Sequence, residues 1–318
     1  MTTAEITTMQ EEIRELAAAR DAVILAHNYQ VPEVQDVADY VSDSLGLSRQ
    51  AAATDADTIV FCGVHFMAET AAILSPHKTV LIPDLDAGCS LAASISADQL
   101  RAWKAENPGA VVVSYVNTTA EVKAESDYCC TSGNAKGVIE AIPEDTEILF
   151  LPDMFLGLWL EKVTGRKLRI CMGECHVHAG IRPRDISDMR AAHPDADFLI
   201  HPECGCSTLV MEYVAAGDLD PQGVHMLSTG GMLGYAKAAP AGATAIVATE
   251  TGMLHPLREA RPDIDFVAAN EAASCRFMKL ITLPKLRDTL RATAPEVKVP
   301  EAIAQRARLP IERMVAIG

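Results

Sequence analysis

The feature that most constrains the fold of this 318-residue chain is a pattern that recurs three times along it. Short, β-branched apolar runs, AVILAH, AVVVSY and DFLIH, end at His27, Tyr115 and His201, so successive ends lie 88 and 86 residues apart. Such runs are typical of parallel strands that are buried on both faces. A fixed spacing of this length indicates an internal structural repeat.

A hydroxyl residue follows each of these strand ends at a similar spacing. Ser44 and Ser132 each lie 17 residues after a strand end, and Thr229 lies 28 residues after one. The third repeat therefore carries 11 extra residues, which we assign to the stretch MEYVAAGDLDPQG, residues 211–223.

Each repeat continues with a second strand, a helical segment, a third strand and a cysteine. The second strands contain Ile59, Ile148 and Ile246; the helical segments read HFMAETAAIL, MFLGLWLEKV and GMLHPLREA; the third strands read TVLIP, KLRI and IDFVA; the cysteines are Cys89, Cys175 and Cys275. Strands that alternate with helix-length segments predict β-α-β units and parallel sheets.

We therefore expect an α/β fold of three related αβα units with small parallel sheets, arranged around a pseudo-threefold axis with the active site at the centre. The predicted units are residues 21–104, 105–189 and 190–283. The segments 1–20 and 284–318 are expected to be helical and to pack on this core.

Composition narrows the classes of partner. The chain has 43 acidic residues against 27 Lys and Arg, a formal charge of -16, so we expect it to bind no nucleic acid. No apolar run reaches the 18 residues of a membrane span, and no basic segment precedes an apolar stretch at the start. We expect a cytoplasmic protein without a membrane association. The odd number of cysteines, nine, favours thiols or metal ligands over a disulfide framework.

Polar residues gather where ligands bind in parallel sheets, beyond the carboxyl ends of the strands. His27, Tyr115 and His201 end the first strands, and Tyr29, Asn117 and Glu203 follow two residues later, on the same side if the extended alternation continues. We expect these six side chains to line one central cavity.

The hydroxyl residues Ser44, Ser132 and Thr229 are expected at helix starts. Free backbone N–H groups and the positive end of the helix dipole suit carboxylate or phosphate oxygens there. The alternative is that each of the three is an ordinary helix N-cap.

The three phased cysteines predict a metal site with an open position. Thiolates favour zinc, copper(I) or iron–sulfur clusters, and a structural zinc site normally takes four protein ligands. The remaining cysteines lack the paired C-x2-C spacing of a zinc finger, and their roles stay open. These are Cys62, Cys129, Cys130, Cys171, Cys204 and Cys206.

The ordered motifs of residues 20–290 resemble those of the quinolinate synthase family. They read AHNYQ, SDS, GVHFMAET, PDLDAGCSLA, SYVNTTAEVKAESD, TSGNA, LPD, GECHVHAGI, HPEC, STGGM, ATETGML and CRFMKLITL. The resemblance implies three αβα domains around a central site. It also implies one 4Fe-4S cluster per chain, held by Cys89, Cys175 and Cys275, with its fourth iron free to act as a Lewis acid.

The reaction that the resemblance implies is a step of de novo NAD biosynthesis. Iminosuccinate condenses with dihydroxyacetone phosphate to quinolinate, with release of phosphate and two waters. An aspartate-oxidising enzyme supplies the iminosuccinate, and a transient contact with it is conceivable.

The residues similar to the family's pocket are His27, Tyr29, Ser44, Tyr115, Asn117, Ser132, His178, His201, Glu203 and Thr229. We expect Glu203 to have a raised pKa and to act as general acid and base with Tyr29 and His201 beside it. The others would bind substrate, with the histidines facing carboxylates or the phosphate. Whether Lys237, His65 and Glu250 reach the substrate stays open.

One motif departs from the family. Some members carry C-x-x-C-x-x-C ending at the third ligand, whereas this chain reads NEAASC, so a thiol switch has no support here. Three alternatives remain: another cluster-dependent hydro-lyase, a non-catalytic iron–sulfur sensor, and a structural zinc protein. Products and metal content separate them.

Overall fold

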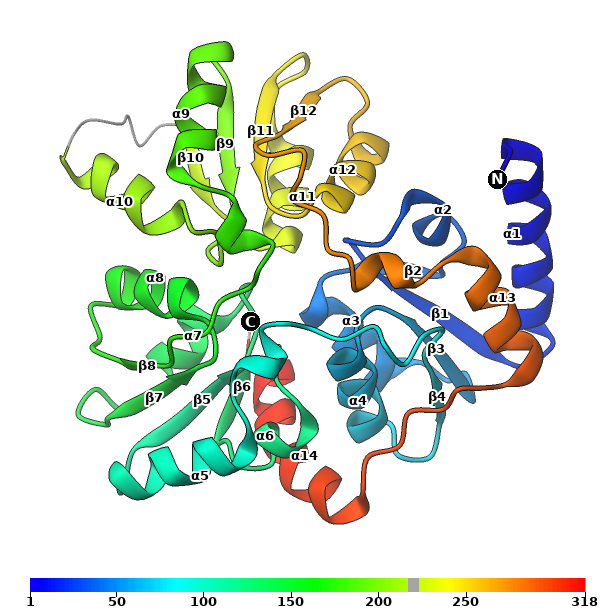
Figure 1. Cartoon of the computed structure of the whole chain (residues 1–318), viewed down its shortest axis with the longest axis horizontal. Coiled ribbons are helices and arrows are strands. Elements are labelled where there is room, and N and C mark those ends of the chain that lie inside the picture. The colour runs from blue at the N-terminus through cyan, green and yellow to red at the C-terminus, as the bar shows by residue number, and fades with distance from the viewer. Residues whose placement is uncertain (217–222, 318) are drawn as a thin grey trace.

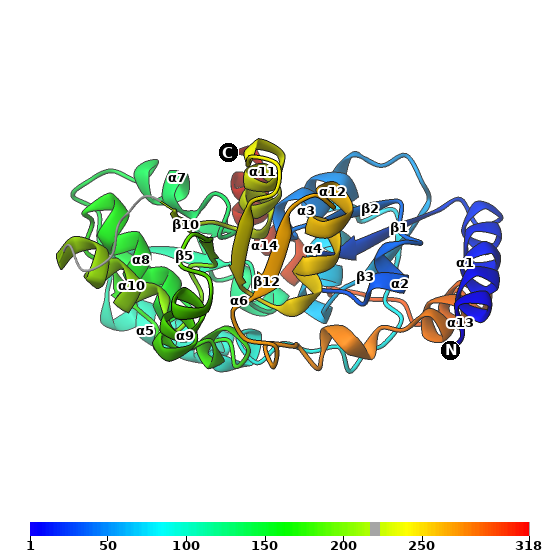
Figure 2. The same cartoon turned by 90° about the horizontal axis from the view of Figure 1, so that it is seen from above.

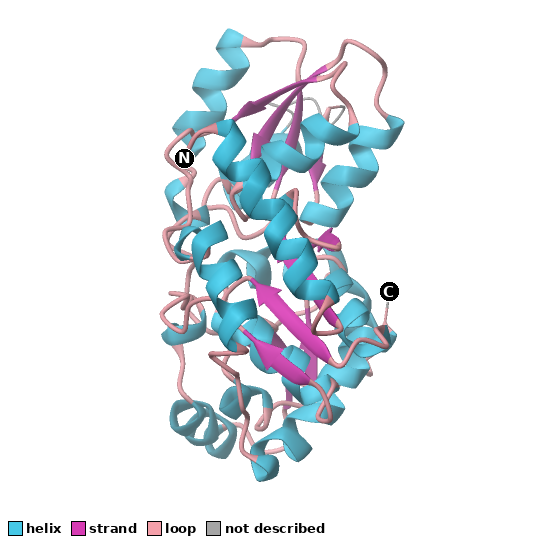
Figure 3. Ribbon diagram, turned by 90° about the vertical axis from the view of Figure 1, so that its right-hand side faces the viewer, coloured by secondary structure: helices cyan, strands magenta, loops and turns pink. Residues whose placement is uncertain are grey.

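Three four-stranded parallel sheets stand around a common centre in the computed structural model (Figure 1). The structure describes residues 1–216 and 223–317. In every sheet the first strand of the unit lies between the second and the third, and the fourth lies outside the third. Helices flank each sheet (Figure 3). The predicted fold class of three αβα units is confirmed.

The three units repeat the same order of elements. Unit 1 contains β1 (Ala22–His27), α2 (Pro32–Gln35), β2 (Tyr40–Ser42), α3 (Ser44–Ala53), β3 (Thr58–Cys62), α4 (His65–Leu74) and β4 (Thr79–Leu81). Unit 2 contains β5 (Val111–Tyr115), α6 (Ala120–Lys123), β6 (Tyr128–Cys130), α7 (Ala135–Glu140), β7 (Ile148–Leu151), α8 (Met154–Thr164) and β8 (Arg169–Ile170). Unit 3 contains β9 (Asp197–Ile200), α10 (Ser207–Ala216), β10 (Val224–Met226), α11 (Thr229–Ala238), β11 (Thr244–Ala248), the 3-10 turn η3 (Thr251–Met253), α12 (Leu254–Ala260) and β12 (Asp265–Ala268).

The sequence pattern located three strands per unit, and the structure adds a fourth. The additional strands β2, β6 and β10 have three residues each and pair only with the first strand of their sheet. A three-residue edge strand has no apolar run long enough to be recognised, which is why the sequence pattern missed it.

The extra length of unit 3 begins in a longer helix. Helix α10 has 10 residues, whereas its counterparts α2 and α6 have four each. The rest of the predicted insertion, residues 217–222, lies outside the described residues.

A helix that follows each cysteine covers the sheet of the next unit. These covering helices are α5 (Ala97–Glu106), α9 (Pro183–Ala192) and α13 (Leu283–Ala292). Leu100 of α5 shares a buried cluster with Val112 of β5, and Ile186 of α9 shares one with Phe198 of β9. Leu286 of α13 belongs to the cluster that contains β1, so the ring of units closes. Because α5 and α9 cross the predicted borders at 104/105 and 189/190, the domain boundaries stay predictions.

The two ends of the chain pack on this ring. Helix α1 (Thr3–Ala18) lies along α13 at one end of the molecule (Figure 2). Helix α14 (Glu301–Ala316) packs against α3 and α4 of unit 1 and against α6 and β6 of unit 2. The side-chain amide of Asn134 donates to the carbonyl oxygens of Met314 and Ile317, both at 2.8 Å. Helices α1, α13 and α14 lie in the two flanking segments. Among the described residues, none of the helices has the length and apolar character needed to cross a bilayer.

Replacing Leu286 with Ala should lower the free energy of unfolding by about 2–5 kcal/mol, because the side chain is fully buried in the apolar cluster that α13 shares with β1. Urea denaturation followed by circular dichroism measures the effect. Leu309→Ala on α14 is the matched control, since Leu309 is exposed and its loss should change stability by less than about 0.5 kcal/mol. Equal effects at both positions would contradict the role of α13.

Candidate active site

One cavity lies where the first strands of the three units end. It holds about 720 Å³ of space free of protein atoms, open solvent at the mouth included. All thirteen residues singled out in the sequence line it: His27, Tyr29, Ser44, Cys89, Tyr115, Asn117, Ser132, Cys175, His178, His201, Glu203, Thr229 and Cys275. Glu250 lines it as well, whereas Lys237 is exposed near the end of α11 and His65 turns to Glu69, 3.7 Å away.

His27 and His201 are held as neutral donors by the same local turn. The Nδ1 atom of each ring accepts the backbone N–H of the residue two positions later, Tyr29 at 3.2 Å and Glu203 at 3.4 Å. The ring proton of the neutral form therefore sits on Nε2, and that atom of His201 lies 3.1 Å from the Ser132 hydroxyl. Burial lowers the pKa of His27 to about 3 and that of His201 to about 4.

Glu203 is the charged centre of the cavity. One of its oxygens accepts the Tyr115 hydroxyl, and the other lies 3.1 Å from Nδ1 of His178. Burial raises the pKa of Glu203, but the imidazoles of His178 and His201 and the hydrogen bonds from His178 and Tyr115 outweigh it and lower the pKa to about 2. The expectation of a raised pKa is wrong, because the sequence did not show that two donors, Tyr115 and His178, and the imidazole of His201 converge on this carboxylate.

His178 carries the balancing positive charge. Burial alone would lower its pKa, but the neighbouring Cys175 and Glu203 raise it well above the usual value. Its Nε2 atom faces two hydroxyls, Thr249 at 2.9 Å and Tyr29 at 3.2 Å. The arrangement is an anion and a cation side by side, with two hydroxyls on the cation's outer nitrogen.

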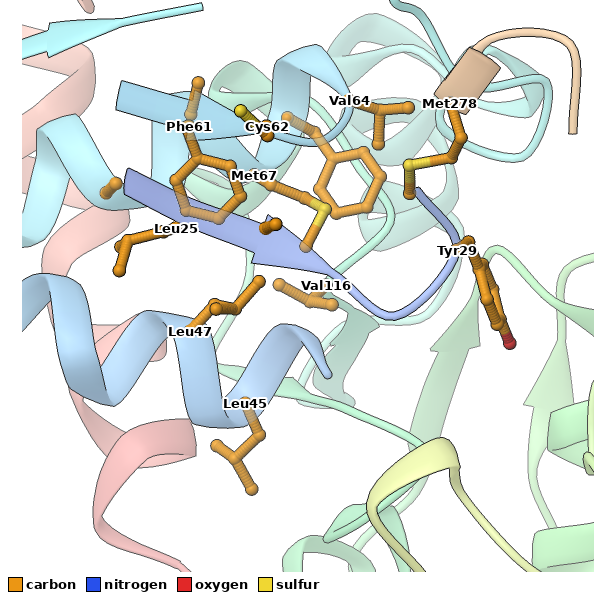
Figure 4. Close-up of a cluster of buried hydrophobic side chains, with 14 of the residues drawn as sticks. Leu25, Tyr29, Leu45, Leu47, Phe61, Cys62, Val64, Met67, Val116 and Met278 are labelled. Atoms are coloured by element: carbon orange, nitrogen blue, oxygen red, sulfur yellow. The ribbon is translucent and has the colours of Figure 1, made fainter. Parts of the chain in front are cut away.

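Tyr29 stands at the border between the apolar core and the cavity (Figure 4). Its ring lies beside the buried cluster around Val116 and Met278, and its hydroxyl points away from the labelled apolar side chains. The hydroxyl lies 2.6 Å from that of Thr249. Burial raises the pKa of Tyr29 well above its usual value, so the phenol keeps its proton. The sequence analysis did not name Thr249, although it directly follows β11 and the strand-end rule applied to that strand would have found it.

Two of the three hydroxyl residues expected at helix starts, Ser44 and Thr229, do not cap their helices. Asp43 caps α3 through the N–H of Gly46 at 2.8 Å, and Ser228 caps α11 through that of Gly231 at 3.2 Å. Ser44 and Thr229 are the first residues of these helices, so the alternative of an ordinary N-cap is wrong for both. Ser132 lies in the turn before α7 and does not open the helix.

The three cysteines share one backbone turn. The cysteine loops, residues 82–91, 171–177 and 269–277, run from the fourth strand of each unit to the 3-10 turns η1 (Ala92–Ser94), η2 (His178–Gly180) and η4 (Met278–Leu280). In each loop the residue four positions after the cysteine donates its N–H to the cysteine carbonyl, at 2.8–3.1 Å. Burial raises the pKa of Cys89 and Cys275, and backbone N–H groups two and three residues later oppose that rise by hydrogen-bonding the sulfur.

The cysteine loops also meet one another. The Ser90 hydroxyl lies 2.7 Å from the Nδ1 atom of His176, and the His176 ring meets Phe277 edge to face with centroids 5.8 Å apart. The three thiols therefore converge on one wall of the cavity. All nine cysteines are free, and the other six do not line the cavity.

Two sets of side chains offer metal ligands. The three thiols form the first set. Cys175, His178 and Glu203 form the second, with ligand atoms within 4.8 Å of one another. His178 and Glu203 already satisfy each other as an ion pair, whereas Cys89 and Cys275 have no such partner and backbone N–H groups partly offset the rise in their pKa that burial causes. The thiol set therefore fits a metal group better, and three protein ligands leave a coordination position open.

Comparisons with known proteins agree with this geometry. The family model described as "NadA: Quinolinate synthetase A protein" matches residues 11–316. A quinolinate synthase from Mycobacterium sp. (strain KMS) is 59% identical over 308 residues, which is 96% of this chain and 91% of that protein. Those from Mycobacterium tuberculosis and Mycobacterium leprae are 58% and 56% identical over the same share of this chain, and 88% and 87% of their own lengths are covered.

The two neutral histidines predict a loss of stability in mild acid. The unfolded chain binds a proton on each near pH 6.5, whereas the folded chain does so only at about 4 for His201 and about 3 for His27. The unfolded state therefore binds more protons below pH 6.5, and stability falls as the pH drops toward 4, by about 1.4 kcal/mol per pH unit for each histidine.

Urea denaturation at pH 7 and pH 5 measures this loss. His201→Gln should remove about half of the part that the two histidines cause, because Gln takes up no proton. His77→Gln, at an exposed position, is the control and should leave the pH dependence unchanged. An unaltered pH dependence in the His201→Gln variant would show that His201 takes up its proton over the same pH range in the folded and unfolded chain, and would contradict the lowered pKa.

Proposed function

Since the chain belongs to the quinolinate synthetase A family, we propose that it is a quinolinate synthase of NAD biosynthesis. It condenses iminosuccinate with dihydroxyacetone phosphate to quinolinate and releases phosphate and two waters. The observation that carries the proposal is one cavity in which three thiols on one wall meet the Glu203–His178 ion pair and neutral donors from all three units. A non-catalytic sensor has no need of that polar lining.

We propose a 4Fe-4S cluster, one per chain, as the metal cofactor. Cys89, Cys175 and Cys275 would hold it, because they share one turn and only they among the nine cysteines line the cavity. When bound, such a cluster with an open iron supplies a Lewis acid that makes a substrate oxygen a better leaving group.

The substrates are anions with carboxylate and phosphate groups, and the cavity offers donors that match them. The Nε2–H groups of His27 and His201, the hydroxyls of Ser44, Ser132 and Thr229 and the side-chain N–H groups of Asn117 would bind substrate oxygens. Tyr115 donates its hydroxyl hydrogen to Glu203 and would contact substrate only as an acceptor. The side-chain oxygen of Asn117, which has no partner within the described residues, would likewise accept a substrate hydroxyl or N–H. Holding two substrates in one orientation lowers the entropic barrier of a condensation.

Proton transfers would use the ion pair. Glu203 is ionised at neutral pH and can take a proton from a substrate carbon or nitrogen, while Tyr115 holds the carboxylate in place. Protonated His178 can donate at Nε2, where the hydroxyls of Tyr29 and Thr249 lie within 3.2 Å. An acid and a base fixed side by side suit a sequence of condensation and dehydration steps.

The expected partners are the two small-molecule substrates and, transiently, the aspartate-oxidising enzyme that produces iminosuccinate. We also propose a cytoplasmic location. Nine free cysteines suit a compartment that keeps thiols reduced.

Metal content and product formation test the proposal. Protein purified without oxygen should contain about four iron and four acid-labile sulfide per chain, and quinolinate should form only when both substrates are present. Replacing Cys89, Cys175 or Cys275 with Ser should abolish iron binding. Cys62→Ser is the control, because Cys62 is buried in β3 and does not line the cavity. Zinc in place of iron would contradict the cofactor, and turnover of a single hydroxy acid would favour a hydro-lyase.

Replacing Glu203 with Gln should reduce turnover by about 10²–10⁴-fold, because the amide cannot accept a proton. Iron content should stay at the wild-type level. Glu259→Gln, an exposed position on α12, is the matched control and should behave as wild type. Normal activity in the Glu203→Gln variant would remove Glu203 from the mechanism.

A further inference from the structure

Glu250 is a completely buried carboxylate that has no part in the chemistry above. It follows β11, and both of its oxygens are engaged. Oε1 accepts the backbone N–H of Cys275 at 2.9 Å and lies 2.9 Å from Nζ of Lys279. Oε2 accepts the N–H of Gly252 at 2.7 Å. The carboxylate thus fixes the backbone of the third cysteine.

Lys279 extends this contact to another unit. Its side chain is 25% exposed, and its ammonium group also donates to the backbone carbonyl of Tyr29. One ion pair therefore connects the third cysteine loop with the loop that carries Tyr29 in unit 1.

The two loops are closely packed around this ion pair. A Cβ atom on Gly252 would lie 2.8 Å from the carbonyl carbon of Tyr29 and 2.8 Å from Oε2 of Glu250. The side-chain amide of Gln35 donates to the carbonyls of Gln30 at 2.8 Å and Gly252 at 3.2 Å. The backbone of Tyr29 therefore rests directly against the turn that Glu250 caps.

The internal repeat shows that the αβα unit does not require this ion pair. The residue after Glu250 donates its N–H to the carbonyl two positions before the cysteine, as His65 and Met154 do, so the counterparts of Glu250 are Val64 and Asp153. The counterparts of Lys279, four residues after Cys89 and Cys175, are Ala93 and Ala179. Unit 1 has no charge at either position, and the Asp153 carboxylate of unit 2 caps α8 and has Ala179 where unit 3 has Lys279. Both units form the same sheet and the same cysteine turn without this ion pair.

A buried ion pair is a weak source of stability, because removing both charges from water costs about as much as their attraction returns. Its presence in one unit out of three therefore needs another reason. The ion pair lies where unit 3 meets unit 1, and the residue found only there is Tyr29, whose hydroxyl lies 3.2 Å from Nε2 of His178.

We propose that Glu250 and Lys279 are positioning residues that fix the backbone of Tyr29 relative to Cys275. They keep the phenol hydroxyl at one distance from His178 and from the wall of thiols. The inference rests on the proposed function, since it assigns these residues to the same reaction. They touch neither substrate nor reacting atoms and act through Tyr29.

Four variants of the iron-loaded enzyme test this role. Lys279→Met and Glu250→Gln should each lower kcat at least tenfold and change KM less than threefold, because Tyr29 would be misplaced while the substrate-binding donors stay. Lys279→Arg should restore most of kcat, since a second cation can pair with Glu250. The kcat of the double variant Glu250→Gln/Lys279→Met should be no lower than that of the less active single variant, because the same interaction is lost in all three.

Lys285→Met is the matched control. Lys285 also joins units 3 and 1, through Asp84 and the carbonyl of Leu280, yet none of its hydrogen bonds or ion pairs reaches Tyr29 or Cys275. Its loss should leave kcat and KM at the wild-type values. A drop in kcat equal to that of Lys279→Met would mean that any contact between the units matters, and would overturn the specific role.

Amide hydrogen exchange gives a reading that does not depend on activity. A peptide covering residues 27–35 should exchange faster in Lys279→Met than in wild type or Lys285→Met, while iron per chain stays unchanged. The inference would be overturned if hydrogen exchange did not change, or if both single variants kept the wild-type kcat. It would also be overturned if the losses of the two single variants multiplied in the double variant, or if Lys279→Met lost its iron. A wild-type protein without iron or without quinolinate formation would instead contradict the proposed function, and the exchange comparison would still decide whether the pair fixes the Tyr29 loop.

Discussion

The covering of each small sheet by a helix from the neighbouring unit is the constraint on which the site depends. A parallel sheet is apolar on both faces and has to be buried on both. Here α5, α9 and α13 supply cover for the next sheet along the ring, and α13 returns to unit 1. The chain reaches each covering helix through a cysteine loop, so all three loops lie at the centre. Convergence of the thiols thus follows from how the sheets are covered.

Charge breaks the threefold symmetry of the cavity. His27 and His201 occupy equivalent positions and are neutral, whereas Glu203 is ionised beside a protonated His178. A low-dielectric cavity tolerates a charge only where a partner is close, and a partner has to be supplied by the fold. The pairing of Glu203 with His178 gives the symmetric scaffold one anion and one cation at defined positions.

The repeat in the sequence predicted most of the fold and many of the residues that line the cavity. Strand ends, helical segments and cysteines recur in phase because each unit solves the same packing problem, and polar residues at strand ends lie in the cavity by the geometry of parallel sheets. The pattern failed where the signal is short or unique to one unit. The three-residue edge strands carried no apolar run, and Thr249 has only Gly63 and Pro152 at the equivalent positions of units 1 and 2, so no recurring polar residue marked it.

The sequence by itself determined the α/β class, the three units and twelve of the residues that line the cavity, since periodicity and strand-end position are local properties of the chain. A thirteenth, His178, followed only from the family resemblance. Only the tertiary structure decided their chemical states. The pKa of Glu203 is low because groups from units 2 and 3 converge on it, and Ser44 is free because Asp43 caps its helix. Likewise, Lys279 of unit 3 meets the backbone of Tyr29 only after the ring closes. Such properties depend on distances between residues far apart in the chain, and no local pattern records them.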